Sequence, residues 1–89
     1  MITLYDLSDI IRENMIIRRY AGQGGRWTAH FEHAEVKEGA ILSSEYGNAD
    51  SPAAALADYA RKIEGKLLVF NAFNKDDCRE ISVPAEVTT

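Results

Sequence analysis

The stretch GNADSPAAALADYARKIEG, residues 47–65, decides the fold because it carries both the start and the stop signals of a helix. Ser51 is a preferred N-cap residue, and the fixed φ of Pro52 suits the first helical position. Gly65 stands where a helix-ending glycine belongs. An apolar stripe lies between them at helical spacing: Leu56, Tyr59, Ala60 and Ile63. The pattern predicts a helix over residues 52–64.

Short segments rich in strand-forming residues flank this helix on both sides. They are residues 15–20, 27–32 and 40–46 before the helix, and residues 66–71 and 79–83 after it. The first two enclose the glycine-rich residues 21–25, which predicts a hairpin. The polar residues 33–39 are expected to form a second turn with Val36 pointing inward. Three strands in a meander are the simplest arrangement.

A second helix is predicted at the N-terminus, over residues 4–13. Thr3 can cap it, and Asp6 at the third position completes an approximate capping box. The element order is then helix, three strands, helix and one or two further strands. We expect an α+β fold in one domain, residues 1–89, with an antiparallel sheet of three to five strands packed by two helices. Residues 85–89 are expected to fray.

Composition places the chain among globular proteins. Of its 89 residues, 46% are hydrophobic and 27% are charged, which is unlike the composition of disordered chains. The single cysteine, Cys78, cannot form an internal disulfide, which favours a reducing compartment. The N-terminus lacks a basic region, and no apolar run approaches the ~20 residues needed to cross a bilayer. We therefore expect a cytoplasmic protein without membrane contact.

The charge balance bears on the partner. The net charge is −4, and residues 32–64 hold seven acids against three bases. Binding to nucleic acids draws on Lys and Arg that neutralise phosphates, so an acidic chain disfavours DNA or RNA. A protein partner is expected instead. The chain is expected to be a monomer or a homodimer, the latter by pairing an edge strand such as residues 79–83.

No catalytic, metal or cofactor site is predicted. Residues 22–25 do not place a third glycine at the fixed offset of a dinucleotide-binding loop, and a predicted strand follows them where that loop requires a helix. His30 and His33 lie three apart on a predicted strand, so they should point to opposite faces and not share a metal. His30 and Glu32 could share a face as an acid/base pair, but no nucleophile accompanies them. Cys78 is expected to be a partly buried strand residue.

Two charged sets are the candidate partner-binding residues. The acidic set could gather on one exposed strand face and suit a basic partner: Glu32, Glu35, Glu38, Glu45 and Asp50. The basic set flanks the glycine-rich loop: Arg18, Arg19 and Arg26. A merely solubilising surface is the alternative for both.

The aromatic residues are divided between the core and the surface. The expected core members are Trp27, Phe31, Tyr46, Tyr59 and Phe70. The expected exposed anchors are Tyr5, Tyr20 and Phe73.

The segment from Tyr46 to Ala60 resembles a strand-to-helix transition found in small phage and prophage proteins of unknown function. In those proteins the pattern Gly-x-x-(x)-(Ser/Thr)-Pro-x-x-Ala-Leu connects the strand to the helix. The segment is also similar to the corresponding transition of HicB-like antitoxin domains, although Ala54 replaces the helix glutamate of that family. The element order resembles that of double-stranded-RNA-binding domains. The basic helix start of those domains is replaced here by residues 51–55, which removes the chief phosphate contacts.

These resemblances give two functional hypotheses. The first is a non-enzymatic, phage-type accessory protein that binds a host or phage macromolecule, which would place it in the cytoplasm of a bacterial host. One form of this hypothesis is an acidic inhibitor of a nucleic-acid-binding host defence complex, in the manner of anti-CRISPR proteins. The alternative is a HicB-like antitoxin or regulatory module that binds a small basic toxin. An enzyme centred on His30 and Glu32 is a third class and would require a concave pocket around them.

Overall fold

The computed structural model describes residues 2–22 and 24–89 and has an α+β fold. Met1 and Gln23, the latter in the predicted hairpin loop, lie outside the described residues. The two helices are α1, Leu4–Ile11, and α2, Pro52–Ile63. The strands are β1 Ile2–Thr3, β2 Met15–Arg19, β3 Trp27–Phe31, β4 Ala34–Glu38, β5 Ile41–Ser43, β6 Gly47–Ala49, β7 Leu67–Phe70, β8 Arg79–Ser82 and β9 Val87–Thr88.

Helix α1 begins with the predicted capping box. The Thr3 hydroxyl accepts a hydrogen bond from the Asp6 N–H at 3.0 Å, and the Asp6 carboxylate accepts one from the Thr3 N–H at 3.3 Å. The helix ends at Ile11 because Arg12 adopts the left-handed conformation, φ 58°. It is therefore two residues shorter than the sequence pattern predicts.

Helix α2 is confirmed almost to the residue. The Ser51 hydroxyl accepts a hydrogen bond from the Ala54 N–H at 3.1 Å, and Pro52 occupies the first turn. Gly65 has φ +70°, as expected of a glycine that follows a helix end. The predicted apolar stripe is buried throughout.

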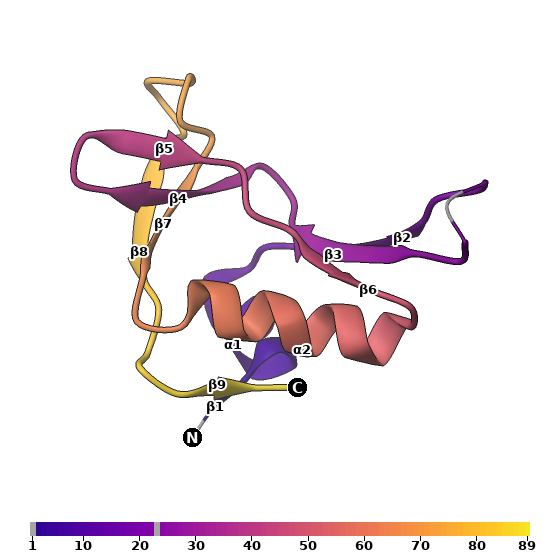
Figure 1. Cartoon of the computed structure of the whole chain (residues 1–89). Helices are drawn as coiled ribbons and strands as arrows, with labels where there is room; N and C mark the ends of the chain where they lie inside the picture. The colour runs from indigo at the N-terminus through magenta and orange to yellow at the C-terminus, as the bar shows by residue number, and fades with distance from the viewer. Residues whose placement is uncertain (1, 23) are drawn as a thin grey trace.

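The strands form two antiparallel sheets and one parallel pair (Figure 1). The first sheet has the order β2-β3-β6, and the second has the order β5-β4-β7-β8. Helix α2 lies along β3 and β6, and the β2–β3 hairpin reaches past its N-terminal end (Figure 1). The predicted hairpin is therefore confirmed, with Met15 opposite Phe31 and Arg19 opposite Trp27.

The predicted three-stranded meander is wrong. Residues 34–38, expected within a turn, form strand β4, although Val36 points inward as expected and is buried. The expected strand 40–46 gives only β5, and β6 begins at Gly47. Strand β5 belongs to the second sheet and β6 to the first, because β5 pairs with β4 and β6 pairs with β3.

The C-terminal tail also differs from the expectation that residues 85–89 fray. Strand β9 pairs in parallel with β1, with Ile2 opposite Val87 and Thr3 opposite Thr88. The Val87 side chain is only 8% exposed and belongs to the core. The first and last strands therefore lie side by side (Figure 1).

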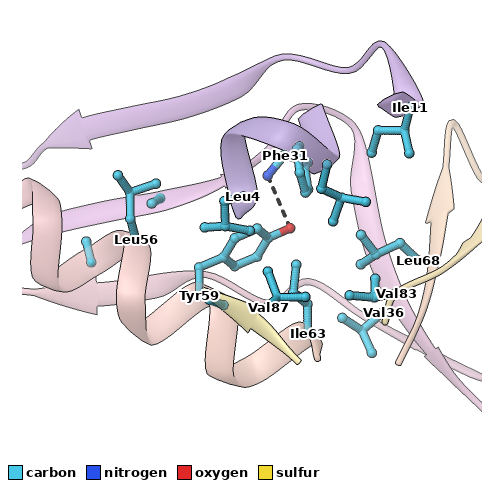
Figure 2. Packing of buried hydrophobic residues seen from close by; sticks show 14 of the residues in the cluster. Leu4, Ile11, Phe31, Val36, Leu56, Tyr59, Ile63, Leu68, Val83 and Val87 are labelled. Atoms are coloured by element: carbon cyan, nitrogen blue, oxygen red, sulfur yellow. Dashed lines mark hydrogen bonds between the residues drawn. The ribbon is translucent and has the colours of Figure 1, made fainter. Parts of the chain in front are cut away.

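The core lies between α2, α1 and the inner faces of both sheets (Figure 2). Its largest fully buried side chains include Tyr59, Phe31 and Phe70, as predicted. The Phe31 ring stands edge-on to both Tyr59 and Phe70, with ring centroids 5.9 and 6.0 Å apart. Trp27 is half-buried at the margin of this cluster. Phe31 thus joins the first sheet to the second.

Candidate functional site

Segments β3–β4 and β5–β6 run antiparallel to each other through both sheets and form a long two-stranded ribbon. The candidate site lies where the two arms of this ribbon stop pairing. The ribbon's last pair in the first sheet is Ala29 with Gly47, and its first pair in the second sheet is Val36 with Ser43. Six residues of one arm and three of the other separate these pairs. The longer arm turns at His33, which has φ 63°, so the two arms part and leave a hollow.

This hollow, here called the break pocket, has a volume of about 470 Å³. Three segments supply its walls: the β3–β4 turn, the β5–β6 connection and the loop after β7. The lining residues are His30, His33, Ala34, Glu35, Ser44, Tyr46, Asn71, Ala72, Phe73 and Asn74. Its wall is therefore mixed, with aromatic rings beside amide, imidazole and carboxylate groups.

At the break, the backbone N–H and C=O groups of Phe31 have no strand partner on the β6 side and contact side chains. Continuing the register of the first sheet would pair Phe31 with Glu45. The Phe31 N–H instead donates to the Tyr59 hydroxyl at 3.1 Å (Figure 2), and the Phe31 carbonyl lies 2.9 Å from His30 Nδ1. Two side chains therefore replace the missing strand partner.

The contact between His30 Nδ1 and the Phe31 carbonyl holds the His30 imidazole at the wall of the pocket. A carbonyl oxygen only accepts, so Nδ1 carries the proton of this bond, and Nε2 of a neutral ring is left as an acceptor. The ring stands edge-on to Tyr46, with centroids 4.7 Å apart and planes at 88°. The His30 ring is thus held from two sides at the wall of the pocket.

Phe73 forms the rim of the pocket and is 93% exposed. The loop that carries it is tied at its base, because the Asn71 N–H donates to the His33 carbonyl at 3.0 Å and the Asn74 N–H donates to the Asn71 carbonyl at 2.9 Å. Asn71 has φ 56°, a left-handed conformation that asparagine tolerates. A large apolar ring is therefore presented to solvent from a turn with internal hydrogen bonds.

The predicted acidic set does not gather on one face. Glu35 lines the break pocket, whereas Glu38 lies three residues along β4 and pairs with Lys66 at the far end of the sheet. Glu32 lies in the turn, 3.8 Å from His33 Nε2. Glu45 and Asp50 flank β6 in the other sheet. Only Glu35 belongs to the site.

The predicted basic set lies apart from the pocket, on the hairpin. Arg18 and Arg19 are adjacent on β2 and so point to opposite faces. The Arg26 Nε donates to the Asn48 side-chain oxygen at 3.0 Å, beside a smaller hollow of about 280 Å³. The structure therefore places one arginine on each face of β2 and holds the third against β6.

The expectation that His30 and His33 point to opposite faces of one strand is wrong. Strand β3 ends at Phe31, and the turn that follows brings His33 to the same pocket as His30. Glu32 approaches His33 and not His30, so the suggested acid/base pair is not formed. Within the described part of the chain, no three His, Cys, Asp or Glu residues are grouped as metal ligands.

Exposure corrects two further expectations. Tyr46, expected in the core, is 46% exposed and lines the pocket. Cys78, expected in a partly buried strand, is exposed in the turn before β8. Phe73, Tyr5 and Tyr20 are exposed as predicted. Sequence reasoning missed Asn71 and Ser44, because neither lies in a motif and only the break brings them together.

No helix within residues 2–22 and 24–89 combines the length and apolar character needed to span a membrane. Searches of protein-family models, of curated proteins and of solved structures found no match to this chain.

Proposed function

We propose that this chain is a non-enzymatic accessory protein that binds a second protein through the break pocket. The observation that carries the proposal is Phe73, which is 93% exposed at the pocket rim. Exposed aromatic rings beside a hollow are typical anchors of protein interfaces, because covering them removes a large apolar area from water. The hydrogen-bonded base of the Phe73 loop lowers the entropy cost of ordering it on binding.

The chemistry of the wall favours a cationic side chain of the partner. Among the described lining residues, Glu35 is the one carboxylate, and neither Lys nor Arg is present. Tyr46 contributes an aromatic ring, and ring faces attract Lys and Arg side chains. The net charge of −4 adds long-range attraction for a basic partner. An Arg or Lys at the centre of the interface therefore fits the pocket.

Both hypotheses from the sequence name a basic partner. An acidic inhibitor would bind the nucleic-acid-binding surface of a host defence complex, and an antitoxin module would bind a small basic toxin. The break pocket supplies the same contact in either case. The identity of the captured protein distinguishes them, because a toxin is a small single chain and a defence complex is a nucleoprotein.

Affinity capture from a bacterial lysate, with matched variants, tests the proposal. Phe73→Ala and Glu35→Gln alter the pocket, while Tyr5→Ala removes an aromatic ring that is 58% exposed on α1. We expect a basic protein that is retained by the wild type and by Tyr5→Ala and is lost with both pocket variants. Equal retention by all four proteins would refute a role for the pocket, and no retained protein would refute the proposed function.

A further inference from the structure

We propose that two copies of this chain associate through β2, so that their first sheets join into one continuous sheet. Strand β2 is an edge of that sheet. The opposite edge, β6, is closed by α2, because the Asp58 carboxylate accepts from the Asn48 N–H at 2.9 Å and the Lys62 ammonium donates to the Tyr46 carbonyl at 2.8 Å. New strand pairing is therefore available at β2 and not at β6.

The register shows which backbone groups of β2 face outward. The Tyr20 N–H donates to Arg26, and the Glu32 N–H donates to Asn14, so the even-numbered residues of the strand point toward β3. Residues alternate in an antiparallel ladder. The N–H and C=O groups of Met15, Ile17 and Arg19 consequently face away from the sheet.

These outward groups are self-complementary about a two-fold axis at Ile17. An antiparallel second copy places its own Ile17 opposite Ile17 and its Arg19 opposite Met15. Each of the three outward residues then meets an outward residue, and each such pair can exchange two hydrogen bonds. With the two-fold axis at Ile17, all outward backbone N–H and C=O groups of β2 can be paired between the two copies without a shift in register. An isologous dimer requires such a self-complementary edge.

The side chains are also compatible with this pairing. Arg18 of one copy lies opposite Ile16 of the other, so the arginines do not directly oppose one another. Like charges placed directly opposite would destabilise the pair. Ile17, which is 40% exposed, would be covered by its symmetry mate. The apolar first half of the strand thus packs against the aliphatic stems of the arginines.

The far end of the β2–β3 hairpin extends beyond the rest of the fold (Figure 1). The hairpin reaches away from the second sheet and past α2, so its distal part stands clear of both (Figure 1). The predicted dimer edge at residues 79–83 is a weaker candidate. In β8 the N–H of Val83 donates to Lys66, so only Glu80 and Ser82 have outward backbone groups. That edge offers two outward-facing residues for pairing, against three on β2.

Sedimentation equilibrium of matched proline variants tests the dimer. Ile17→Pro removes an outward N–H, which an edge strand tolerates, and Ser82→Pro makes the same kind of change at the other edge. We expect the wild type and Ser82→Pro to dissociate from dimer to monomer on dilution, and Ile17→Pro to be a monomer throughout, with an unchanged circular dichroism spectrum. Ile17→Lys, which keeps the N–H but places charges opposite each other, should weaken the dimer as well.

A wild type that is monomeric at every concentration would overturn the inference. A dimer lost with Ser82→Pro and kept with Ile17→Pro would assign the interface to β8 instead. If Ile17→Pro does not fold, Ile17→Lys decides, because a wild-type-like dimer in that variant contradicts pairing about Ile17.

Discussion

The Tyr59 hydroxyl accepts the hydrogen bond of the Phe31 N–H at 3.1 Å inside the core (Figure 2). The contact replaces a strand partner at the point where the ribbon leaves the first sheet. Tyr59 comes from α2, so a helix side chain completes the hydrogen bonding of a sheet. The break that forms the pocket is therefore compatible with a fully satisfied backbone at Phe31.

Tyr59→Phe should lower the free energy of unfolding by about 1 to 3 kcal/mol, because it leaves the buried Phe31 N–H without a partner. The ring itself stays, so little packing is lost. Urea denaturation measures the change. Tyr46→Phe is the matched control, since its side chain is 46% exposed, and its effect should be within about 0.5 kcal/mol. Equal effects of the two substitutions would contradict the role given to Tyr59.

The same hydroxyl predicts a loss of stability in alkali. Burial raises the pKa of Tyr59 from 10.0 to about 12, although the Phe31 N–H acts in the opposite direction. In the unfolded chain Tyr59 loses its proton near pH 10, whereas the folded chain keeps it, so the stabilising contribution declines as pH rises from 10 to 12. The wild type should lose about 2 kcal/mol more than Tyr59→Phe over this window. Parallel pH curves for the two proteins would contradict the prediction.

Local signals were sufficient to predict both helices. The capping box at Thr3 and the Ser51-Pro52 start each involve contacts within a few residues, which sequence spacing records directly. The hairpin of β2 and β3 is similarly local, since its strands are joined by a short glycine-rich loop. The α+β class follows from these elements alone.

The break pocket could not be predicted because it depends on pairing between distant segments. Strand β4 has the polar sequence AEVKE, in which only Val36 is buried. This composition is typical of a turn, so the sequence predicts a turn there. Its central place between β5 and β7 is set by tertiary pairing. The short β6 likewise contains Gly47, a residue that sequence reasoning assigns to a turn. Without these two strands, Glu35, Tyr46 and Phe73 cannot be brought together.

Gly47→Ala should be strongly destabilising, by about 3 kcal/mol or more, because α2 crosses β6 at this residue. A Cβ atom on Gly47 would lie 1.9 Å from the Ala55 carbonyl oxygen and 2.7 Å from the Tyr59 backbone nitrogen. Both neighbours are backbone atoms and cannot rotate away. Thermal unfolding measures the change.

Gly24→Ala is the comparison for this prediction. Gly24 has φ +64°, and a Cβ there meets no atom within 4 Å, so that substitution measures backbone strain alone, about 1 kcal/mol. A Gly47→Ala effect no larger than that of Gly24→Ala would show that α2 and β6 can separate without cost.

Asp58→Asn should lower the free energy of unfolding by about 1 kcal/mol at neutral pH. Desolvation disfavours the charged form of Asp58, but the Asn48 N–H together with Lys62 and Arg61 outweighs it and lowers the pKa below 3.8. The contribution of the charge is therefore present above pH 3.8 and is lost as pH falls through the folded-state pKa. The difference between wild type and variant in urea denaturation should shrink in acid. Asp9→Asn, an exposed change on α1, is the control at neutral pH, and its effect on the free energy of unfolding should be within about 0.5 kcal/mol.

Shortening the chain by residues 86–89 tests whether the tail is part of the fold. Val87 is 8% exposed within the core, and β9 pairs with β1, whose Thr3 also caps α1. Removal should expose core residues and loosen α1, lowering the free energy of unfolding by about 2 to 4 kcal/mol. Val87→Ala, which keeps the strand pairing, should account for about 1 to 2 kcal/mol of this loss. Glu86→Ala is the control, because Glu86 is exposed and precedes the strand. A truncated chain as stable as the wild type would restore the expectation of a frayed tail and place the stabilisation of α1 in its capping box alone.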